Sequence, residues 1–539
     1  MGEVADRLGE VGLPEPVTAL ARRRWDAIVI GAGHNGLAAA AYLARAGWRV
    51  LVVERRERIG GACTLERPFG DERYLVSPCA YLVGLLDPHV IAELDLRRRG
   101  LRVALADPQI WAPLPDGRAV AIWLDERRTE AGLRDLGVSE RDIAGLRRYG
   151  ELFERIRRRL RVGERDAWLG ECPTRPELEA MLGEPELVEV VFEASIAEVL
   201  EAHVADRRLH DALFGQGITG FWGGPRDRGS AGIRVLHHLG DLEGRGPVWG
   251  YVHGGMGTVS FAIGEAAREA GAEIACGVTA AAIRPGEGVE LDDGTLIRAP
   301  RILCNADPKA LLRLLSEADA PDDFLGRLED WQVRSPVVKV NAALRELPRW
   351  AAAGGEAWPA GGSVDVSHGL DAAQAAFEGC AQGEPSIGFA ELYFQTVHDP
   401  TIAPPGRHLV SAFCQYAPYA LATGGWDDRR EEIGRRVVEL VEDFAPGFGR
   451  LVVESEVLGP PDIEARIGLA GGNIFQGECS PEQMWDRRLA ARTPVGGLYL
   501  CGAATHPGGS VIALGGRNAA QAALADAGAV GAALLSSHA

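Results

Sequence analysis

Residues 26–54 read DAIVIGAGHNGLAAAAYLARAGWRVLVVE: a short apolar strand, a glycine-rich turn, a helix, and a second strand that ends in an acid. Gly31 allows the tight turn out of the first strand, Gly33 lets backbone approach a pyrophosphate, and Gly36 lets the helix pack closely on the sheet. The start of the helix directs free N–H groups and the positive dipole end at phosphate oxygens. Glu54 has the spacing of an acid that hydrogen-bonds a ribose hydroxyl. The stretch predicts a dinucleotide site, because an ordinary glycine turn would leave this acid unexplained.

The residues that follow the acid favour FAD over NAD. Residues 55–62 read RRERIGGA, so a second pair of glycines comes soon after the ribose acid. This suggests that the chain turns again over the same ligand. Arg56 and Arg58 are charge-assisted donors that could reach a ribose or phosphate, although a solvated charge cluster before a loop would explain them equally well.

Composition excludes several classes of function. The chain has 539 residues, 57 basic against 76 acidic, and a formal net charge of −19. Such a balance disfavours nucleic acid as a partner, because there is no excess of cations to neutralise phosphates. It also argues against docking on anionic lipid, although a local apolar patch leaves peripheral membrane contact open. The longest apolar runs, such as residues 37–44, are too short to span a bilayer.

The nine cysteines are scattered and form no Cys-x-x-Cys pair. This pattern fits reduced thiols in a cytoplasmic chain and lacks the redox pair of a flavin disulfide reductase. Cys63 and Cys501 invite the idea of a covalent flavin link, but both stand among small residues, where packing is the better explanation. No histidine and carboxylate spacing of a zinc site occurs, so no metal is expected.

Nucleotide-type glycine patterns occur at the start, middle and end of the chain, with less regular segments between them. We expect an α/β fold in which a Rossmann-like FAD-binding domain comprises residues 25–105, 246–312 and 466–539. An interleaved α+β substrate domain would comprise residues 106–245 and 313–465, after an N-terminal lead of residues 1–24. The active site should lie at the seam between the domains.

Several elements outside the nucleotide turn can be predicted from periodicity. Helical periodicity with many charges extends over residues 125–245. Among the remaining expected elements are strands at 273–283, 301–304, 337–344 and 409–416, and helices at 258–270, at 427–444 and from about 510 onward.

With these motifs in hand, the chain resembles the phytoene desaturase and carotenoid isomerase type of FAD-dependent oxidoreductase. It is most similar to the soluble branch that includes pyridine nucleotide-disulfide oxidoreductase domain proteins. The resemblance rests on the following motifs, which span nearly the whole chain: GAGHNGL (31–37), ERRERIGGA (54–62), GYVHGGMG (250–257), GGNIFQGE (471–478), LYLCGAATHPGGSV (498–511) and GRNAA (516–520). The first motif is shared by many flavoproteins, whereas the last two are more selective.

This resemblance implies a glutathione reductase or amine oxidase-like fold and a non-covalent FAD. The residues that it implies as cofactor contacts are Gly31, Gly33, His34, Asn35, Gly36, Glu54, Arg55, Arg56, Gly60, Gly61, Ala62, Ala280, Asn305, Gly502, Ser510 and Val511. Of these, Ala280 would contact the adenine, Gly502 would pass the pyrophosphate, and Ser510 and Val511 would face the flavin ring. Two departures stand out: the cysteine pair is missing, and His253 stands where carotenoid desaturases commonly carry arginine.

A flavin accepts a hydride from an activated C–H bond, and the protein then supplies orientation, a base and exclusion of water. The histidines near the cofactor segments are candidate bases. His506, beside the expected flavin face, and His253 are the two that we single out as catalytic, against the alternative that each is a loop histidine bonded to backbone.

Three functions compete. The leading one is an FAD-dependent dehydrogenase or desaturase that takes a hydride from an apolar or conjugated small molecule. The second is a redox-neutral polyene isomerase in which reduced FAD is not consumed. The third is a flavin-bound protein whose main role is assembly or partner binding. The sequence leaves a homo-oligomer open.

Overall fold

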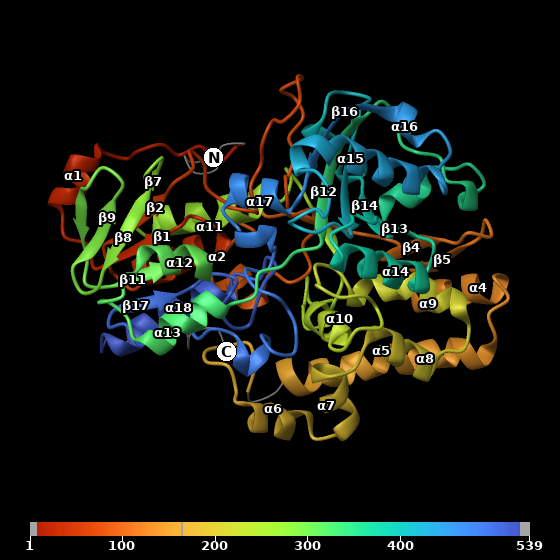
Figure 1. The fold of residues 1–539 in the computed structure, drawn as a ribbon, viewed down its shortest axis with the longest axis horizontal. Coiled ribbons are helices and arrows are strands. Elements are labelled where there is room, and N and C mark those ends of the chain that lie inside the picture. Colours follow the sequence, from red (N-terminus) through yellow and green to blue (C-terminus); the bar gives the residue numbers. More distant parts are fainter. Residues whose placement is uncertain (1–7, 163–164, 529–539) are drawn as a thin grey trace.

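The computed structural model describes residues 8–162 and 165–528. The nucleotide sheet and its helices occupy the left of Figure 1, a second large sheet the upper right, and a group of helices the lower right. The chain passes between the first two parts more than once, so both are built from separated segments.

The nucleotide sheet is parallel and five-stranded. Its order is β17 (Leu498–Leu500), β11 (Ile302–Cys304), β1 (Ala27–Ile30), β2 (Val50–Glu54) and β7 (Glu273–Cys276). Apart from Glu273, every residue of these strands is buried, as the continuous apolar runs of a parallel sheet require. The α/β fold class is thereby confirmed.

Helices cover both faces of this sheet. One face packs on α2 (His34–Arg45), α11 (Gly257–Glu269) and α18 (Leu514–Asp526). The other face packs on a three-stranded antiparallel sheet of β8 (Ala280–Arg284), β9 (Gly288–Leu291) and β10 (Leu296–Arg298), and on α12 (Pro308–Leu314) and α13 (Asp322–Asp330). Leu315, Phe324, Leu328 and Trp331 therefore share a core with the nucleotide sheet. The domain limits given above stay predictions, and this packing extends the nucleotide side past residue 312.

The second sheet has seven strands in the order β16 (Val452–Leu458), β12 (Val337–Leu344), β15 (His408–Gln415), β14 (Phe389–Tyr393), β13 (Ser363–Ser367), β4 (Ile110–Pro113) and β5 (Ala119–Ile122). Neighbouring strands are antiparallel, except that β13 and β4 are parallel. The helices α14 (Leu370–Ala381), α15 (Trp426–Glu442) and α16 (Phe448–Leu451) lie beside it (Figure 1). A two-stranded ladder of β3 (Val103–Leu105) and β6 (Gly250–Val252) stands apart.

The region expected to be helical does form helices. It contains α4 (Glu126–Asp135), α5 (Glu140–Arg161), α6 (Arg175–Leu182), α7 (Pro185–Phe192), α8 (Ile196–His203), α9 (Arg207–Leu213), the short turn η1 (Phe214–Gly217) and α10 (Ser230–His238). The α-helices of the described residues not yet named are α1 (Val17–Arg22), α3 (Pro88–Glu93) and α17 (Pro460–Ile467).

Two expected elements differ from the structure. The strand expected over 273–283 is split into β7 and β8, because Gly277 turns the chain at φ +73°. The helix expected from about 510 begins at Leu514, because Ser510 and Ala513 take the left-handed conformation, at φ +76° and +67°. By contrast, β12 coincides with the predicted strand 337–344, and β15 and α15 differ from theirs by one or two residues.

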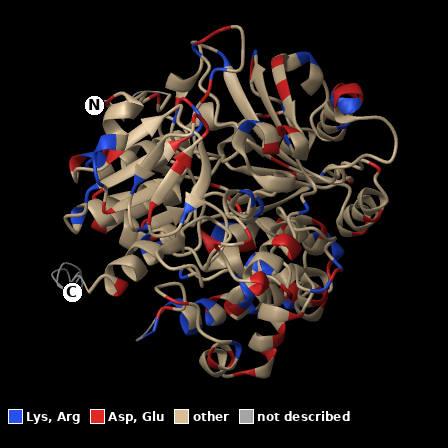
Figure 2. Cartoon of the chain, turned by 60° about the vertical axis from the view of Figure 1, so that its left-hand side comes forward, with Lys and Arg blue, Asp and Glu red and all other residues tan. Residues whose placement is uncertain are grey.

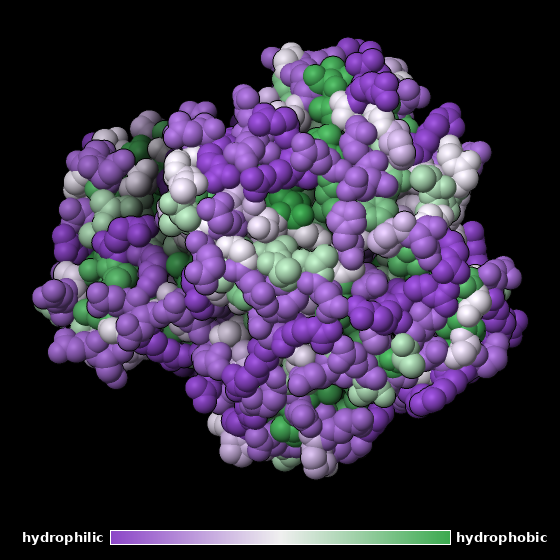
Figure 3. Space-filling model, turned by 45° about the vertical axis from the view of Figure 1, so that its right-hand side comes forward, coloured by the Kyte–Doolittle hydropathy of each residue, from purple (hydrophilic) through white to green (hydrophobic). Residues whose placement is uncertain are grey.

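The face of the molecule in Figure 3 is predominantly polar. Acidic and basic residues are interspersed along the ribbon in Figure 2. On the face in Figure 3, apolar residues appear as patches between larger polar areas. Within residues 8–162 and 165–528, no helix is both long enough and apolar enough to cross a membrane.

Candidate functional site

The turn between β1 and α2 forms the first wall of the site. Gly33 caps α2 without any side-chain hydrogen bond to the first turn, so the N–H groups at this helix end face outward. Gly60 pairs with Gly33 across a short bridge, and a Cβ on Gly61 would lie 3.3 Å from the Gly33 Cα. The second glycine pair therefore lies against the first glycine turn.

Close packing of α2 on α18 brings the C-terminal segment to the same place. A Cβ on Gly516 would lie 2.0 Å from the Asn35 carbonyl oxygen, and a Cβ on Gly36 would lie 2.1 Å from the Gly31 oxygen. Only glycine fits at such distances. The loop before α18, with Ser510 and Val511, is thereby held beside the start of α2.

Glu54 ends β2 with its carboxylate fixed. Its two oxygens accept hydrogen bonds from the backbone N–H of Ala32 at 2.8 Å and of Arg56 at 2.9 Å. The side chain is 7% exposed and faces the cavity described next.

A cavity of about 650 Å³ runs from this turn to the second sheet. Predicted cofactor residues that line it are Gly31, Gly33, His34, Asn35, Glu54, Arg55, Gly60, Gly61, Ala62, Ala280, Asn305, Ser510 and Val511. They come from the start, middle and end of the chain, so the structure brings these three stretches together around one space.

Three predicted cofactor residues do not line the cavity. Gly36 lies inside α2 against Gly31. Arg56 forms an ion pair with Glu66 and donates to the Gly61 carbonyl at 3.3 Å. Gly502 lies behind Asn305, whose carbonyl oxygen would be 2.9 Å from an added Cβ. The role that the structure gives to all three is packing around the residues that do line it.

The residues present fit a dinucleotide. His34 Nε2 and Asn35 Oδ1 are buried without hydrogen-bond partners at the start of α2. Burial lowers the pKa of His34 to about 4, so the imidazole is neutral and can donate or accept a hydrogen bond there. Free helix N–H groups, glycines that allow close approach and a fixed carboxylate are the features that bind a pyrophosphate and a ribose.

The opposite wall of the cavity is one face of the seven-stranded sheet. Strand register places Lys339 opposite Phe413, Phe413 opposite Glu391, and Glu391 opposite Asp365. All four side chains line the cavity. A row of three ionisable groups thus crosses the sheet from β12 to β13.

Asp365 and Glu391 form a buried carboxyl pair. They are 6% and 8% exposed and stand directly opposite on antiparallel strands, where Cβ atoms approach to about 5 Å. Burial raises the pKa of Asp365 to about 7. Burial and the neighbouring Asp365 raise the pKa of Glu391 well above its usual range. Burial and their mutual repulsion therefore favour the protonated form of at least one of the two carboxyls near neutral pH.

Lys339 does not neutralise this pair. The strand β15 separates the lysine from Glu391, and neighbouring strands are about 4.8 Å apart, so Phe413 lies between the two charges. The Nζ of Lys339 instead donates to Asn341 Oδ1 at 3.0 Å and to the Ser411 hydroxyl. Burial lowers the pKa of Lys339 to about 8.

Aromatic rings complete this end of the cavity. Tyr81 stacks on Tyr393 with ring centroids 4.5 Å apart and contacts Phe413 at 5.6 Å. Trp249, Ile474 and Phe475 also line the space. The chamber therefore offers mostly apolar walls with a few buried ionisable groups, which is the usual composition of a small-molecule site.

The two histidines predicted as catalytic do not reach the cavity. His506 is buried elsewhere, with Nε2 bonded to the Ala167 carbonyl at 2.7 Å, and burial lowers its pKa to about 4. His253 is exposed beside Asp399. Cys63 does line the cavity, but burial raises its thiol pKa to about 12, so it is not a ready nucleophile for a covalent link.

Sequence analysis missed Lys339, Asp365 and Glu391. Each stands in an otherwise apolar or small-residue strand, in the stretches PVVKVN, SVDVS and FAELY. An ionisable residue inside such a strand is a signal of a buried polar site. Nothing in the sequence, however, indicates that these three strands are neighbours.

A Rossmann-like sheet whose glycine turn opens into a chamber of this kind defines a nucleotide-dependent oxidoreductase of the flavin type. Comparison with known families agrees. Residues 29–87 match the NAD(P)-binding Rossmann-like domain, and residues 145–524 match the flavin containing amine oxidoreductase family. The chain belongs to that family, and its cofactor is FAD.

Relatives match along nearly the whole length. The mouse (Mus musculus) pyridine nucleotide-disulfide oxidoreductase domain-containing protein 2 is 34% identical, over 93% of this chain and 94% of the relative. A limonene dehydrogenase component from Castellaniella defragrans is 27% identical, over 94% and 95%. Hydroxyneurosporene desaturase of Cereibacter sphaeroides is 28% identical, over 93% and 97%. The predicted resemblance to phytoene desaturase-type enzymes and to this soluble branch is confirmed.

Solved structures share the fold. An oxidoreductase from Methanosarcina mazei superposes with a TM-score of 0.58 at 16% identity, covering 93% of this chain and all of the other. Cyclohexylamine oxidase from Brevibacterium oxydans gives 0.52 at 18% identity, covering 95% and 98%. Among the described residues, no group of three or more His, Cys, Asp or Glu side chains is placed to hold a metal ion.

Proposed function

We propose that the protein is an FAD-dependent dehydrogenase of the desaturase type, acting on an apolar or conjugated small molecule. The observation that carries this proposal is the single cavity that extends from the nucleotide turn to a chamber of aromatic rings and buried carboxyls. The names of two full-length relatives, a limonene dehydrogenase component and a hydroxyneurosporene desaturase, support the same reaction class.

The cofactor supplies the hydride acceptor when it is bound. The sites on the protein that would hold it are the N-terminus of α2, Glu54 and the Gly60-Gly61 turn, with Ser510 and Val511 beside the ring. We propose non-covalent binding, because the Cys63 thiol that faces the cavity stays protonated.

The carboxyl pair has the properties of the proton acceptor. When two adjacent C–H bonds become a C=C bond, one carbon loses a hydride and the other loses a proton, and both electrons leave with the hydride. The pKa of Asp365, at about 7, leaves part of this carboxyl ionised near neutral pH, and the ionised oxygen can accept the proton that the substrate loses. This assignment replaces His506 and His253, which lie outside the cavity.

The aromatic walls would orient the substrate and exclude water. Tyr81, Phe413 and Trp249 present flat apolar surfaces to the cavity, which suits a rigid or conjugated molecule. Lys339 holds a proton at Nζ on the same face of the sheet and fixes Asn341 and Ser411 around it.

The test is anaerobic reduction of the purified holoprotein, followed by absorbance near 450 nm, against a panel of polyenes and monoterpenes, their carboxylic-acid derivatives, cyclic alcohols and amines. A polyene or monoterpene that bleaches the flavin in a stoichiometric, substrate-dependent way supports the proposal. Reduction by amines alone would overturn it, and so would the absence of reduction by every compound. Acid precipitation that leaves the flavin on the protein would overturn non-covalent binding.

The same experiment separates the redox-neutral alternative. An isomerase would need prereduced flavin and would change the substrate's double-bond geometry with no net transfer of electrons to an acceptor. Product analysis by mass is decisive, because dehydrogenation lowers the substrate mass by about 2 Da whereas isomerisation does not change it.

A further inference from the structure

One partly buried arginine in the cavity wall has no counter-ion among the described residues. Arg234 lies on α10 and lines the cavity together with Gln216, His237 and Trp249. Its Nε is buried and has no hydrogen-bond partner. In the ranges that the structure describes, no carboxylate comes within ion-pair distance of this guanidinium. Burial lowers the pKa of Arg234, and the Tyr149 hydroxyl is the group that opposes this effect.

Three other arginines with enclosed side chains differ from Arg234, because the terminal nitrogens of each guanidinium bond to a carboxylate or to backbone carbonyls. The comparison set is Arg161 with Asp87 at 2.7 Å, Arg517 with Glu93 at 2.8 Å, and Arg488, which donates to the Ala503 carbonyl at 2.7 Å and to further carbonyls. Removing a guanidinium from water is costly unless an anion or several acceptors replace the solvent. Arg234 faces a cavity, so the missing partner can come from a ligand.

The surroundings of Arg234 hold it in place but supply no negative charge. Its guanidinium lies 5.3 Å from the centroid of Phe153. The Tyr149 hydroxyl is nearby but forms no hydrogen bond of good geometry, and a phenol is neutral at physiological pH. Glu154, on the same helix as these rings, is held by Arg157 at 2.8 Å.

The charge of Arg234 acts on its neighbour His237. The pKa of His237 is lowered to about 3, by burial first and by the charge of Arg234 second. His237 is therefore neutral and packs edge-on against Trp249, with ring centroids 5.4 Å apart. One fixed cation with neutral polar neighbours is complementary to a ligand group that carries one negative charge. A planar guanidinium can form two parallel hydrogen bonds with a carboxylate, which makes a carboxylate the best fit.

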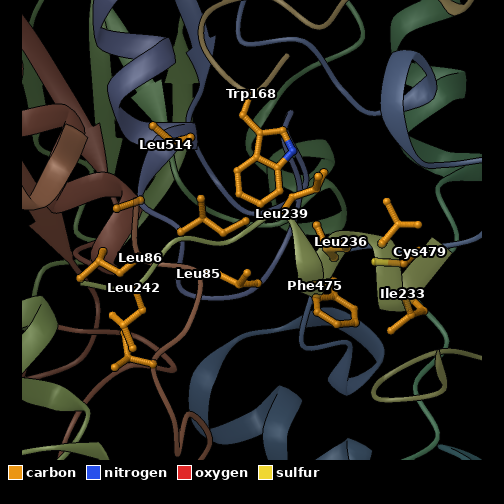
Figure 4. Close-up of a cluster of buried hydrophobic side chains, with 14 of the residues drawn as sticks. Leu85, Leu86, Trp168, Ile233, Leu236, Leu239, Leu242, Phe475, Cys479 and Leu514 are labelled. Carbon is orange, nitrogen blue, oxygen red and sulfur yellow. The ribbon is translucent and has the colours of Figure 1, made fainter. Parts of the chain in front are cut away.

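The helix that carries Arg234 is anchored firmly. Ile233, Leu236 and Leu239 are buried and lie among Leu85, Phe475 and Trp168 (Figure 4). This packing fixes α10 against the nucleotide part of the molecule, so the guanidinium keeps its place at the cavity wall when no ligand is present.

We infer that Arg234, with Gln216 and His237 beside it, is the anchor for a carboxylate at one end of the substrate. The inference rests on the proposed function and deepens it: the substrate class becomes an apolar or conjugated molecule that ends in a carboxylic acid. The reacting carbon would then lie along the chamber, between this anchor and the flavin side.

The test uses binding as its readout. The probes are 4-phenylbutyrate and its neutral amide, 4-phenylbutanamide, titrated into the flavin-loaded protein by calorimetry and by flavin difference spectra. A charge-assisted pair predicts that the acid binds about 10- to 100-fold more tightly than the amide. In Arg234→Met this preference should fall below about 3-fold, while amide affinity and flavin content stay unchanged.

The matched control is Arg228→Met, which removes an exposed arginine already paired with Glu193 and Glu482, and which should keep the preference for the acid. If Arg234→Met does not fold, Arg234→Lys serves in its place and should show a reduced preference for the acid over the amide. The difference in affinity between acid and amide in the wild-type protein tests the inference in either case. Equal affinity for the two probes, no binding of the acid, or an undiminished preference in the Arg234 variant would overturn the inference.

The two proposals fail in different ways. A preference for the acid without flavin reduction by any compound would leave the anchor standing and refute the dehydrogenase. Flavin reduction by neutral compounds without any preference for the acid would refute the anchor alone.

Discussion

The two ends of the cavity are built by opposite means. At the nucleotide end the wall is mainly backbone: glycines, the free N–H groups of α2 and one fixed carboxylate. At the sheet end the wall is made of side chains, with Lys339, Glu391 and Asp365 aligned across neighbouring strands. A backbone site depends on which residues can adopt a conformation, whereas a side-chain site depends on which strands lie side by side.

This contrast has a functional consequence. A nucleotide shared by many enzymes can be held by a local turn, so the sequence pattern of its binding site is similar in each of them. The chemistry of one particular reaction depends on burial and on neighbouring charges, which shift pKa values only after the chain has folded. The following experiments test the comparison, beginning with the largest expected effect.

Substituting the glycine within α2 should destroy the nucleotide end. Gly36→Ala places a Cβ 2.1 Å from the Gly31 carbonyl oxygen, so helix and turn must separate, at a cost of about 3 kcal/mol or more. We expect loss of bound flavin, measured as the 450 to 280 nm absorbance ratio, together with a lower Tm. The control is Gly150→Ala in α5, where nothing lies within 4 Å of the added Cβ and where stability should rise by up to about 1 kcal/mol. Equal flavin content and equal Tm in the two variants would show that the nucleotide end does not depend on this close backbone packing.

Neutralising the carboxyl pair should abolish chemistry without touching the cofactor. In the double variant Asp365→Asn/Glu391→Gln we expect turnover of a reducing substrate to fall by about 10²- to 10⁴-fold, because no group remains in the pair to accept the proton. Flavin content should not change. An exposed substitution on α14, Glu378→Gln, serves as control. Turnover within a factor of about two of wild type would remove the pair from the mechanism.

Lys339 predicts a pH dependence of stability with a defined sign. Its folded pKa of about 8 lies below the ordinary 10.5, so the unfolded chain binds the lysine proton more tightly. This group therefore destabilises the fold by about 3 kcal/mol below pH 8, and the penalty is lost as the pH rises from 8 toward 10.5. The Tm of wild type minus that of Lys339→Met should increase between pH 7 and pH 10. Lys309→Met, which removes a lysine on α12, is the control, and a difference that falls with pH would contradict the burial of this charge.

The smallest effect is expected at the histidines outside the cavity. His253→Ala should change turnover by less than about twofold, because the side chain is exposed and does not line the chamber. His506→Leu removes the bond to the Ala167 carbonyl and should lower stability by about 1 to 3 kcal/mol, with turnover preserved. A large loss of turnover in either variant, with flavin retained, would identify that histidine as the proton acceptor in place of the carboxyl pair on the sheet.

The residues of the cavity wall differ in how far the sequence could predict them. Gly31, Gly33, Gly60 and Glu54 could be identified because their roles follow from local conformation and from spacing within some thirty residues. Gly502 and Arg56 carried the right pattern, yet the structure places them behind the cavity wall. Asp365 and Glu391 gave only a weak signal, an acid within a strand, since their pairing depends on β13 and β14 meeting in register.

The sequence by itself determined the nucleotide turn, the flavin type of cofactor and the family, because glycine conformation and helix-end geometry are properties of short segments. Only the tertiary structure decided which ionisable groups share the substrate chamber. Burial, the counter-ion of a charge and the distance between strands are set when segments hundreds of residues apart come together, as the isolated Arg234 and the paired Asp365 and Glu391 both show.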